Sequence, residues 1–322
     1  MQITWRSDVG RLWWWLMRKP VAISIGNFDG VHAGHQALIE KAHQAVSGGG
    51  SQGQIVFLAF DPHPASVLRP EQQPDLLTPF SQRADLLRAA GVNEVHRLVP
   101  TPDLLGMSPK SFIESVVAAH QPSFFIEGPD FRFGKGRAGS IETLELLGQQ
   151  HDFEVEVVST AEVVLSDHKI VPARSSLIRW LLSHGRVADA ALVLGRPYQL
   201  TGTVQPGEKQ GRLLGCPTAN CGQVQVMLPA DGVYTGLAND PSGNLQPAAI
   251  SVGSKPTFGG HERLCEVHLI DYEGDPDVYD WPIQVQFKSW IREQLAFGSE
   301  QQLIEQMERD VDCARSRLES MV

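Results

Sequence analysis

The sequence is poor in cysteine and contains no apolar run long enough for a membrane span. None of its four cysteines forms a CxxC pair or has the spacing of a zinc site: Cys216, Cys221, Cys265 and Cys313. We therefore expect reduced, mostly buried thiols in a cytoplasmic protein. The apolar stretch RLWWWLMRKP, at residues 11–20, has roughly a third of the length of a membrane span and is bounded by charges. It predicts neither a membrane segment nor a targeting segment.

Positive charge is also scarce. The 27 Lys and Arg residues are outnumbered by 37 Asp and Glu residues, which gives a formal net charge of -10. This balance argues against a nucleic-acid-binding protein and against binding to an anionic membrane. Any anionic substrate would need local cations that overcome the overall repulsion. The length of 322 residues favours two domains, and a hydrophobic content of 42% suffices for a sizeable core.

The first half of the chain alternates between two periodicities. Short runs rich in Val, Ile and Phe predict buried strands at residues 21–28, 55–60, 94–99, 124–127 and 153–158. Segments with helical spacing lie between them, at residues 35–46, 82–90, 112–119 and 141–150. The expected N-caps are Ser81, Ser108 and Ser140, and Pro109 is expected at a first helical position. The alternation predicts a parallel α/β sheet covered on both faces.

The second half has a different pattern. Two short helices are expected at residues 175–183 and 187–194, and strands separated by Gly, Pro, Asn and Asp follow. The expected strands are QLTGTVQ, GVYTGLA, PAAISVG, LCEVHLI and PIQVQFK, and a last helix is expected from residue 300 to about residue 318. We predict a Rossmann-like α/β domain at residues 1–185. A small β-barrel domain with a terminal α-helix is predicted at residues 186–322.

A candidate site lies where the first predicted strand meets the first predicted helix, in ISIGNFDGVHAGHQALIEKA, residues 23–42. A strand that ends in a glycine-containing turn and leads into a helix can bind phosphate through backbone N–H groups. The Asn27 amide can donate a hydrogen bond, and Gly30 and Gly34 allow close approach of the backbone. The motif therefore predicts an anion site.

Two histidines lie three residues apart at the start of this helix. Both imidazoles, of His32 and His35, can face one anion and donate hydrogen bonds to phosphate oxygens as charge develops there, which requires no nucleophile. Two alternatives are a helix start with exposed histidines and an HxxH zinc pair. Zinc needs further ligands, and the helix supplies no spaced Cys, His or Glu.

The string GNFDGVHAGH, at residues 26–35, is more specific than its histidines. It resembles the (H/T)xGH signature of nucleotidyltransferases and, in this longer form, the adenylyltransferase module of bifunctional riboflavin kinase/FAD synthetases. The segments FDPHP, GPDFRFGKGRAG and SSLIR resemble that family in the same order. The resemblance implies that His32 and His35 are catalytic. It also implies nucleotide-binding roles for Gly26, Asn27, Phe28, Asp29, Gly34, Asp130, Arg137, Ser175, Ser176 and Arg179.

The cations that an anionic substrate requires lie in these later segments, as Arg132, Lys135, Arg137 and Arg179. A solvated basic loop is the alternative for Lys135 and Arg137. GPDFRFGKG also resembles a P-loop superficially, but its spacing is one residue too long and Gly136 replaces the required Ser or Thr. Arg174, directly before SSLIR, takes the place of the family's first serine, and Ser176 takes that of its threonine.

The predicted barrel opens with GTVQPGEKQGRLLGCPTANC, residues 202–221. Its glycines, Gly211 among them, suggest a flap over a polyanion, with Lys209 and Arg212 as charge partners. The PTAN sequence supplies the Thr218 hydroxyl and the Asn220 amide, which are hard oxygen donors suited to Mg²⁺ and phosphate. Taken alone, these four residues could equally form a turn with a capping threonine.

The strand RLCEVHLID places a carboxylate inside the predicted barrel. Alternation puts Cys265, Val267 and Leu269 on one face and Glu266 with His268 on the other. A carboxylate within a barrel strand is unusual unless it is paired or functional. The motifs from GTV to IREQLAFGS resemble the riboflavin kinase module of the same family. The resemblance implies that Thr218 and Asn220 bind Mg·ATP and that Glu266 takes the proton of the ribityl 5′-hydroxyl.

The resemblance implies a bifunctional enzyme that uses ATP and Mg²⁺ to convert riboflavin to FMN, and then FMN to FAD with release of pyrophosphate. Two alternatives remain at this point. The Arg174 and Ser176 changes could leave a riboflavin kinase with an impaired adenylyltransferase site, and a non-catalytic flavin-nucleotide sensor would bind without turnover. The sequence leaves open whether the protein forms a homo-oligomer.

Overall fold

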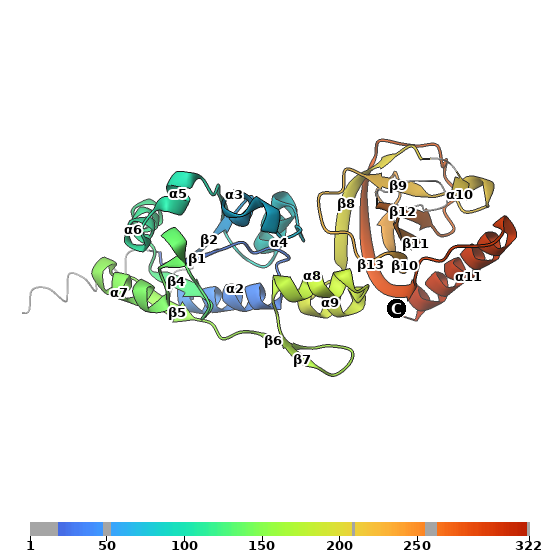
Figure 1. Cartoon of the computed structure of the whole chain (residues 1–322). Coiled ribbons are helices and arrows are strands. Elements are labelled where there is room, and N and C mark those ends of the chain that lie inside the picture. The colour runs from blue at the N-terminus through green and yellow to red at the C-terminus, as the bar shows by residue number, and fades with distance from the viewer. Residues whose placement is uncertain (1–18, 48–52, 208–209, 255–262, 321–322) are drawn as a thin grey trace, which may run out of the picture. The chain divides into compact units, whose positions relative to one another are not determined.

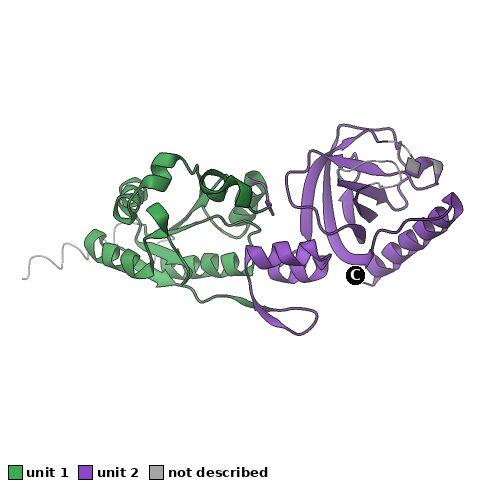
Figure 2. Cartoon of the chain, viewed as in Figure 1, with its two compact units in different colours: residues 1–74, 80–162 green, residues 75–79, 163–322 purple. Residues whose placement is uncertain are grey.

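The computed structural model describes residues 19–47, 53–207, 210–254 and 263–320. The chain forms two compact units (Figure 2). Unit 1 comprises residues up to 74 and residues 80–162; unit 2 comprises residues 75–79 and 163–322. Within unit 2, the short segment 75–79 is held by its backbone, because Met227 N donates to Leu76 O at 2.8 Å.

Unit 1 contains a parallel sheet of five strands in the order β3–β2–β1–β4–β5 (Figure 1). The strands are β1 (Val21–Gly26), β2 (Gln54–Phe60), β3 (Glu94–Leu98), β4 (Phe124–Glu127) and β5 (Glu154–Val157). Chain order runs in one direction from β1 to β3 and then resumes on the other side of β1 with β4. Ligands of open α/β sheets bind at such a switch point, beyond the carboxyl ends of the strands.

Helices cover both faces of this sheet. They are α2 (Ala33–Val46), α3 (Ala65–Leu68), α4 (Phe80–Ala89), α5 (Pro102–Gly106), α6 (Pro109–His120) and α7 (Ile141–His151), with 3₁₀ turns η1 (Pro70–Gln72) and η2 (Lys135–Arg137). Helices α2 and α4 pack on one face, where Ile39 and Leu87 meet Phe57. Helices α6 and α7 pack on the other face, where Ile113 and Leu144 belong to a second core. The predicted doubly covered parallel sheet is confirmed.

The predicted helix starts are confirmed at two places and wrong at one. Ser108 Oγ accepts from Ser111 N, and Ser140 Oγ accepts from Thr143 N, so both serines cap their helices as expected. Pro109 occupies the first turn of α6. Ser81 is not a cap, because α4 already begins at Phe80.

The outer strands of the sheet are less buried than predicted. Every residue of β3 and β5 is exposed or half-buried, whereas β1 and β2 are buried along most of their length. The difference follows from position, because β3 and β5 lie at the two edges of the sheet. Their valines resemble those of central strands in the sequence, but only the sheet order determines which strands are covered.

Unit 2 contains a closed antiparallel barrel in the order β10–β11–β12–β9–β8–β13 (Figure 1). Its strands are β8 (Tyr198–Gln205), β9 (Ala219–Gly222), β10 (Gly232–Asn239), β11 (Leu245–Gly253), β12 (Leu264–Leu269) and β13 (Pro282–Arg292). The helices of the unit are α8 (Ser175–Ser183), α9 (Val187–Leu194), α10 (Gln210–Leu213) and α11 (Glu300–Glu319).

The predicted barrel with a terminal helix is confirmed, whereas β9 was not predicted. The predicted domain boundary near residue 185 falls between α8 and α9 and stays a prediction.

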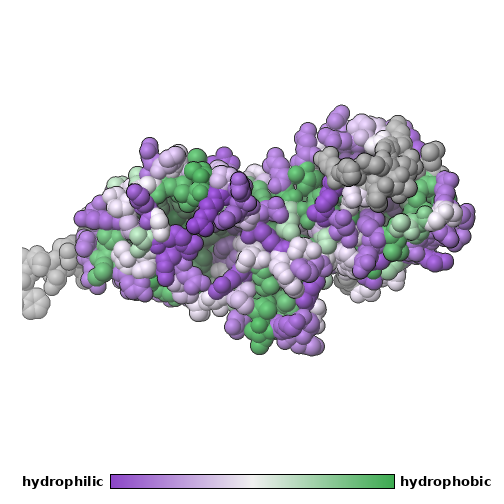
Figure 3. Space-filling model, in the orientation of Figure 1, coloured by the Kyte–Doolittle hydropathy of each residue, from purple (hydrophilic) through white to green (hydrophobic). Residues whose placement is uncertain are grey.

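A two-stranded hairpin, β6 (Glu162–Val164) and β7 (Ile170–Pro172), precedes α8. One hydrophobic side chain of each strand faces solvent, with Val164 54% and Ile170 66% exposed. The hairpin appears as a hydrophobic surface at the lower edge of the space-filling view (Figure 3). Among the described residues, no helix is long and apolar enough to span a bilayer.

Candidate active sites

A strained turn joins β1 to α2 at the switch point of unit 1. Phe28, Gly30 and Val31 have φ angles of 49°, 89° and 43°, in the left-handed region. The polar side chains of this turn fold inward, with Asp29 only 4% and His32 only 6% exposed. Backbone strain and buried polar groups at the carboxyl end of a central strand are typical of a ligand site.

The two predicted histidines cap α2 and stack against each other. His32 Nδ1 accepts the Gly34 N–H at 3.2 Å, His35 Nδ1 accepts the His32 N–H at 3.3 Å, and the ring centroids are 3.7 Å apart. A ring nitrogen that accepts carries no hydrogen, so this geometry assigns the hydrogen of each neutral ring to Nε2. The structure therefore brings together two Nε2–H donors, as expected for an anion site.

Sequence reasoning did not single out Arg83, which holds this turn in place. Its guanidinium is 2% exposed and donates to Asn27 O at 2.7 Å and to Phe60 O at 2.9 Å, thereby joining the ends of β1 and β2. Burial lowers the pKa of Arg83, while the carboxylates of Asp29 and Asp61 oppose that shift. Arg83 is thus a buried cation that fixes the backbone next to the histidines.

The loop after β4 carries the predicted cations at the surface. Asp130, Arg132, Lys135 and Arg137 are all exposed. The backbone of this loop is anchored, because Lys135 N donates to Met107 O at 2.7 Å and Phe133 pairs with Gly139. Only a three-residue 3₁₀ turn follows Gly134, and this differs from the long helix that follows a P-loop.

In the barrel, β12 alternates as predicted. Cys265, Val267 and Leu269 are buried, and Glu266 and His268 are half-buried on the opposite face. Glu266 lies directly across from Asn220 of β9, its partner in the β12–β9 pair. Two of the predicted residues are therefore neighbours although 46 positions separate them in the chain.

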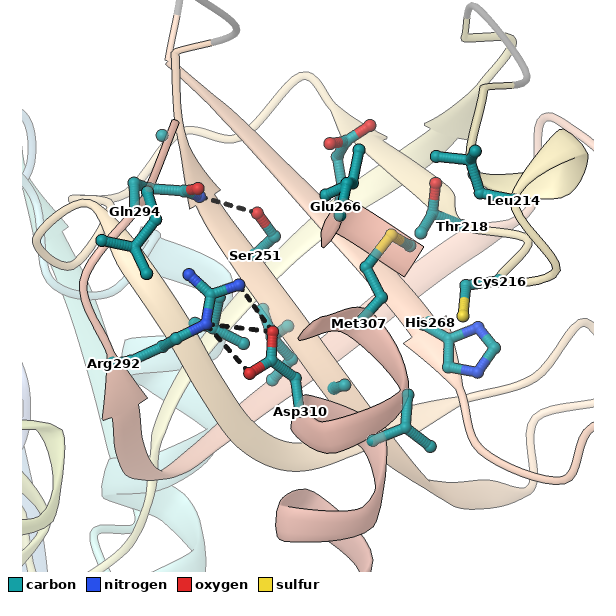
Figure 4. A pocket seen from close by; sticks show the side chains of 18 of the residues that line it. Leu214, Cys216, Thr218, Ser251, Glu266, His268, Arg292, Gln294, Met307 and Asp310 are labelled. Atoms are coloured by element: carbon teal, nitrogen blue, oxygen red, sulfur yellow. Dashed lines mark hydrogen bonds and ion pairs between the residues drawn. The ribbon is translucent and has the colours of Figure 1, made fainter. Parts of the chain in front are cut away.

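The Glu266 face of the barrel opens into a cavity of about 490 Å³ between the strands and α11 (Figure 4). The labelled polar side chains are Thr218, Ser251, Glu266, His268, Arg292, Gln294 and Asp310, and the rest of the wall is mostly apolar. Arg292 of β13 forms a bidentate ion pair with Asp310 of α11, with Nη2–Oδ2 at 2.6 Å. Cys216 also lines the cavity, and burial raises the pKa of its thiol. A cavity of this size and polarity suits a small aromatic ligand.

A second cavity of about 220 Å³ adjoins the first. Thr218 and His268 line both cavities, and Tyr272, Tyr279 and Trp281 supply aromatic wall to the second. Arg212 pairs with Asp277 at 2.8 Å beside this cavity, and Tyr279 donates to the same carboxylate. Two cavities that meet at one hydroxyl are the arrangement expected for a reaction between two bound molecules.

Two glycines make room for this junction. A Cβ on Gly207 would lie 2.1 Å from Asn220 Nδ2, and one on Gly211 would lie 2.4 Å from Cys216 O. At Gly211 the contact is with backbone and only glycine fits, whereas at Gly207 it is with the end of the Asn220 side chain. The expected flap over the PTAN segment thus contacts it directly in the described part of the chain, while Lys209 lies outside the described residues.

Comparison with known proteins decides the family. The family model for FAD synthetase matches residues 17–171 and that for riboflavin kinase matches residues 194–318. The bifunctional riboflavin kinase/FMN adenylyltransferase of Escherichia coli K12 is 31% identical, with 92% of this chain and 93% of that protein covered. The protein of the same name from Bacillus subtilis is 31% identical, with 89% of each chain covered. The chain belongs to the bifunctional riboflavin kinase/FMN adenylyltransferase family. Its activities are those of a riboflavin kinase and an FMN adenylyltransferase, which produce FMN and FAD.

The fold of this family member also occurs in a solved structure. A Streptococcus pneumoniae protein described as a macrolide-efflux protein superposes with a TM-score of 0.81 at 28% identity, over 93% of this chain and 95% of that one.

The structure assembles part of the predicted site set. His32 and His35 meet in unit 1, and Thr218, Asn220 and Glu266 meet in unit 2. Ser175, Ser176 and Arg179 lie in α8, which belongs to unit 2. Within that unit, Arg179 donates from Nε to Asp75 O at 2.6 Å.

Proposed function

We propose that residues 1–185 adenylylate FMN and that residues 186–322 phosphorylate riboflavin. The two family models match separate stretches, each of which lies within one of these ranges and contains one of the two candidate sites. We also propose that the protein acts in the cytoplasm, because its four cysteines lack a disulfide-type or zinc-type pattern.

For the kinase, we propose that riboflavin occupies the 490 Å³ cavity and ATP the 220 Å³ cavity. The observation that carries this proposal is Thr218, which lines both cavities, together with the cross-strand pair of Glu266 and Asn220. Glu266 takes the proton of the ribityl 5′-hydroxyl, and the oxygen attacks the γ-phosphorus. The bond between the γ-phosphorus and the bridging oxygen then breaks, and ADP leaves.

The donor set at this junction suits magnesium. Thr218 offers a hydroxyl, Asn220 an amide oxygen and Glu266 a carboxylate, all hard oxygen donors. We propose that Thr218 and Asn220 hold Mg²⁺, which would neutralise charge on the triphosphate. Gly211 and Arg212 are proposed to border the same phosphates, because Gly211 lines the larger cavity next to Thr218 and Arg212 lies beside the smaller one.

For adenylyl transfer, we propose that the FMN phosphate attacks the α-phosphorus of ATP and that pyrophosphate leaves. His32 and His35 donate from Nε2 to the phosphate oxygens on which charge accumulates. The turn residues Gly26, Asn27, Phe28, Asp29 and Gly34 bind the nucleotide. Asp130, Arg137, Ser175, Ser176 and Arg179 are proposed as further nucleotide-binding residues on the grounds of the family motifs alone.

The first experiment incubates the purified protein with riboflavin, ATP and Mg²⁺ and follows the flavins by chromatography. We expect FMN to rise first and FAD to follow. FMN that accumulates without FAD would contradict the N-terminal assignment and direct attention to Arg174. Bound flavin without conversion would contradict both assignments and favour a sensor.

A further inference from the structure

Glu127, the last residue of β4, places a carboxyl group inside the sheet at the switch point. Its side chain is 3% exposed. Backbone pairing between β1 and β4 reaches only Ile23 and Phe125, and beyond that point Glu127 Oε1 accepts the Ile25 N–H at 2.7 Å. The carboxyl group therefore bridges the two strands where their backbones separate, one residue before the turn at Gly26.

This carboxyl group has no cation beside it. Among the described residues, no Lys, Arg or His forms an ion pair with Glu127, and the Ile25 N–H is its one hydrogen-bond partner. Burial raises the pKa of Glu127 well above its usual value, although the Ile25 N–H opposes the shift. A buried carboxyl group without a counter-charge is neutral. It then accepts through Oε1 and offers an O–H donor at Oε2.

Polar groups without a protein partner among the described residues lie at this fork, the place beyond Ile23 and Phe125 where the backbones of β1 and β4 separate. The one hydrogen bond of the Glu127 carboxyl group among the described residues is made by Oε1, so Oε2 is left to donate. On the neighbouring strand end, the buried Asn27 Oδ1 has no partner among the described residues. Buried polar groups are nearly always bonded, so an exception next to a ligand turn is expected where a ligand completes it. The adjacent turn presents the two histidine Nε2–H donors, which favour an anion.

We propose that Glu127 contacts substrate during adenylyl transfer, donating its Oε2–H to a phosphate oxygen of ATP or FMN bound at the turn of residues 26–32. An ionised carboxylate at this place would repel the phosphates, whereas a neutral acid binds them. A bound phosphate in turn favours the neutral acid, because its negative charge opposes ionisation. This inference rests on the assignment of adenylyl transfer to the N-terminal site.

Two variants, Glu127→Gln and Glu127→Met, distinguish the effect of losing the hydrogen-bond donor from the effect of changing the shape of the side chain. Glutamine keeps a neutral donor and an acceptor for the Ile25 N–H, whereas methionine fills similar space and keeps neither. Initial rates of FAD formation are measured with ATP and FMN varied in turn, and riboflavin phosphorylation by the same preparation checks the other unit. We expect E127M to raise KM by about tenfold or more for the substrate whose phosphate is contacted, and E127Q to stay within about threefold.

Ser24→Ala is the matched control. Ser24 of β1 is also fully buried, its hydroxyl has no partner among the described residues, and its side chain points to the opposite face from that of Ile25. We expect its KM values to equal those of the wild type.

Unchanged KM values in E127M, or an equal rise in KM in E127M and E127Q, would overturn the proposed donor. Should E127M fail to fold, Glu127→Asp withdraws the acid by one methylene and is expected to show the same rise. A wild type that forms no FAD would contradict the N-terminal assignment itself.

Discussion

His32 has two functions at the start of α2, and mutation can separate them. Its Nδ1 caps the helix, and its Nε2–H is proposed to stabilise the reacting phosphates. We expect His32→Ala to lower the rate of FAD formation from FMN by about 10²–10³-fold, as for other lost transition-state donors. Loss of the cap should also lower the free energy of unfolding by about 1 kcal/mol. Riboflavin phosphorylation, measured in the same preparation, should be unchanged.

His32→Asn distinguishes the two effects. Asparagine is a strong N-cap but lacks the second ring nitrogen, so it should restore the stability lost in His32→Ala without restoring FAD formation. An asparagine variant with wild-type rates would show that capping is the whole contribution of His32.

Glu266 is expected to act in the kinase alone. Glu266→Gln keeps the size of the side chain but removes the base, so riboflavin phosphorylation should fall by about 10²–10⁴-fold. FAD formation from added FMN should be unaffected, because His32 and His35 belong to unit 1. Steady-state rates of both reactions test this expectation. A kinase rate within a few-fold of the wild type would remove Glu266 as the base.

Glu127 makes stability depend on pH in a defined direction. Because burial raises its pKa in the folded protein, the folded state holds a proton that the unfolded state releases above the usual pKa of 4.5. The contribution to stability is therefore full below pH 4.5 and is lost as pH rises through the folded pKa. Urea unfolding across this range should show stability falling with pH in the wild type relative to Glu127→Gln. An equal pH dependence of the two proteins would contradict the buried neutral acid.

At the residue scale, the sequence predicts the groups that belong to contiguous motifs and misses those that act across the fold. The histidines were found because GNFDGVHAGH is a specific string. Arg83 gave no signal, because an arginine on an amphipathic helix ordinarily faces solvent. Its partners, Asn27 O and Phe60 O, lie 56 and 23 residues away. Glu127 was missed for the same reason, since only the β1–β4 fork explains its burial.

At the scale of elements, a largely buried ion pair joins the terminal helix α11 to strand β13 of the barrel. The carboxylate of Asp310, on α11, has a side chain 6% exposed and accepts from Arg292 and Gln306. Removing one member of a buried pair leaves the other without a counter-charge. We expect Asp310→Ala to lower the free energy of unfolding of unit 2 by about 3 kcal/mol, measured by urea denaturation. KM for riboflavin should rise with it, because the pair lines the large cavity.

Replacing both partners provides the control for that prediction. Arg292→Met combined with Asp310→Leu removes both charges and should recover part of the lost stability. A double variant as unstable as Asp310→Ala would show that the contribution of the aspartate does not depend on its pairing with Arg292.

Helices were easier to predict than strands. Helices α8 and α9 match the expected ranges because their apolar periodicity is a local property, even though neither has a side-chain N-cap hydrogen bond. Strand β9 has only four residues, Ala219–Gly222, and the first two belong to the PTAN sequence. That sequence alone is typical of a turn, and only pairing with β8 and β12 makes this segment a strand. The exposed edges of the parallel sheet could not be predicted either, because strand order is a property of the whole sheet.

At the scale of the whole molecule, the residues proposed to take part in the two reactions belong to different units, with His32 and His35 in unit 1 and Glu266 in unit 2. His32→Ala should therefore make FMN and stop, and Glu266→Gln should make FAD only from supplied FMN. We expect an equal mixture of the two variants to convert riboflavin to FAD after a lag, because FMN must pass between molecules. Chromatography of the mixture over time tests this expectation. A mixture that forms FMN but no FAD, with both single activities intact, would contradict independent sites.

The two units also differ in the strand edges that they expose. The barrel is closed, so none of its described strands offers an unpaired edge, whereas the parallel sheet ends in β3 and β5. Those edges carry charged or polar side chains in Glu94, His96 and Arg97, and in Glu154 and Glu156. Edge charges oppose the addition of a strand from a second molecule. The same exposed residues that distinguish β3 and β5 from core strands thus protect the enzyme against aggregation through its open sheet.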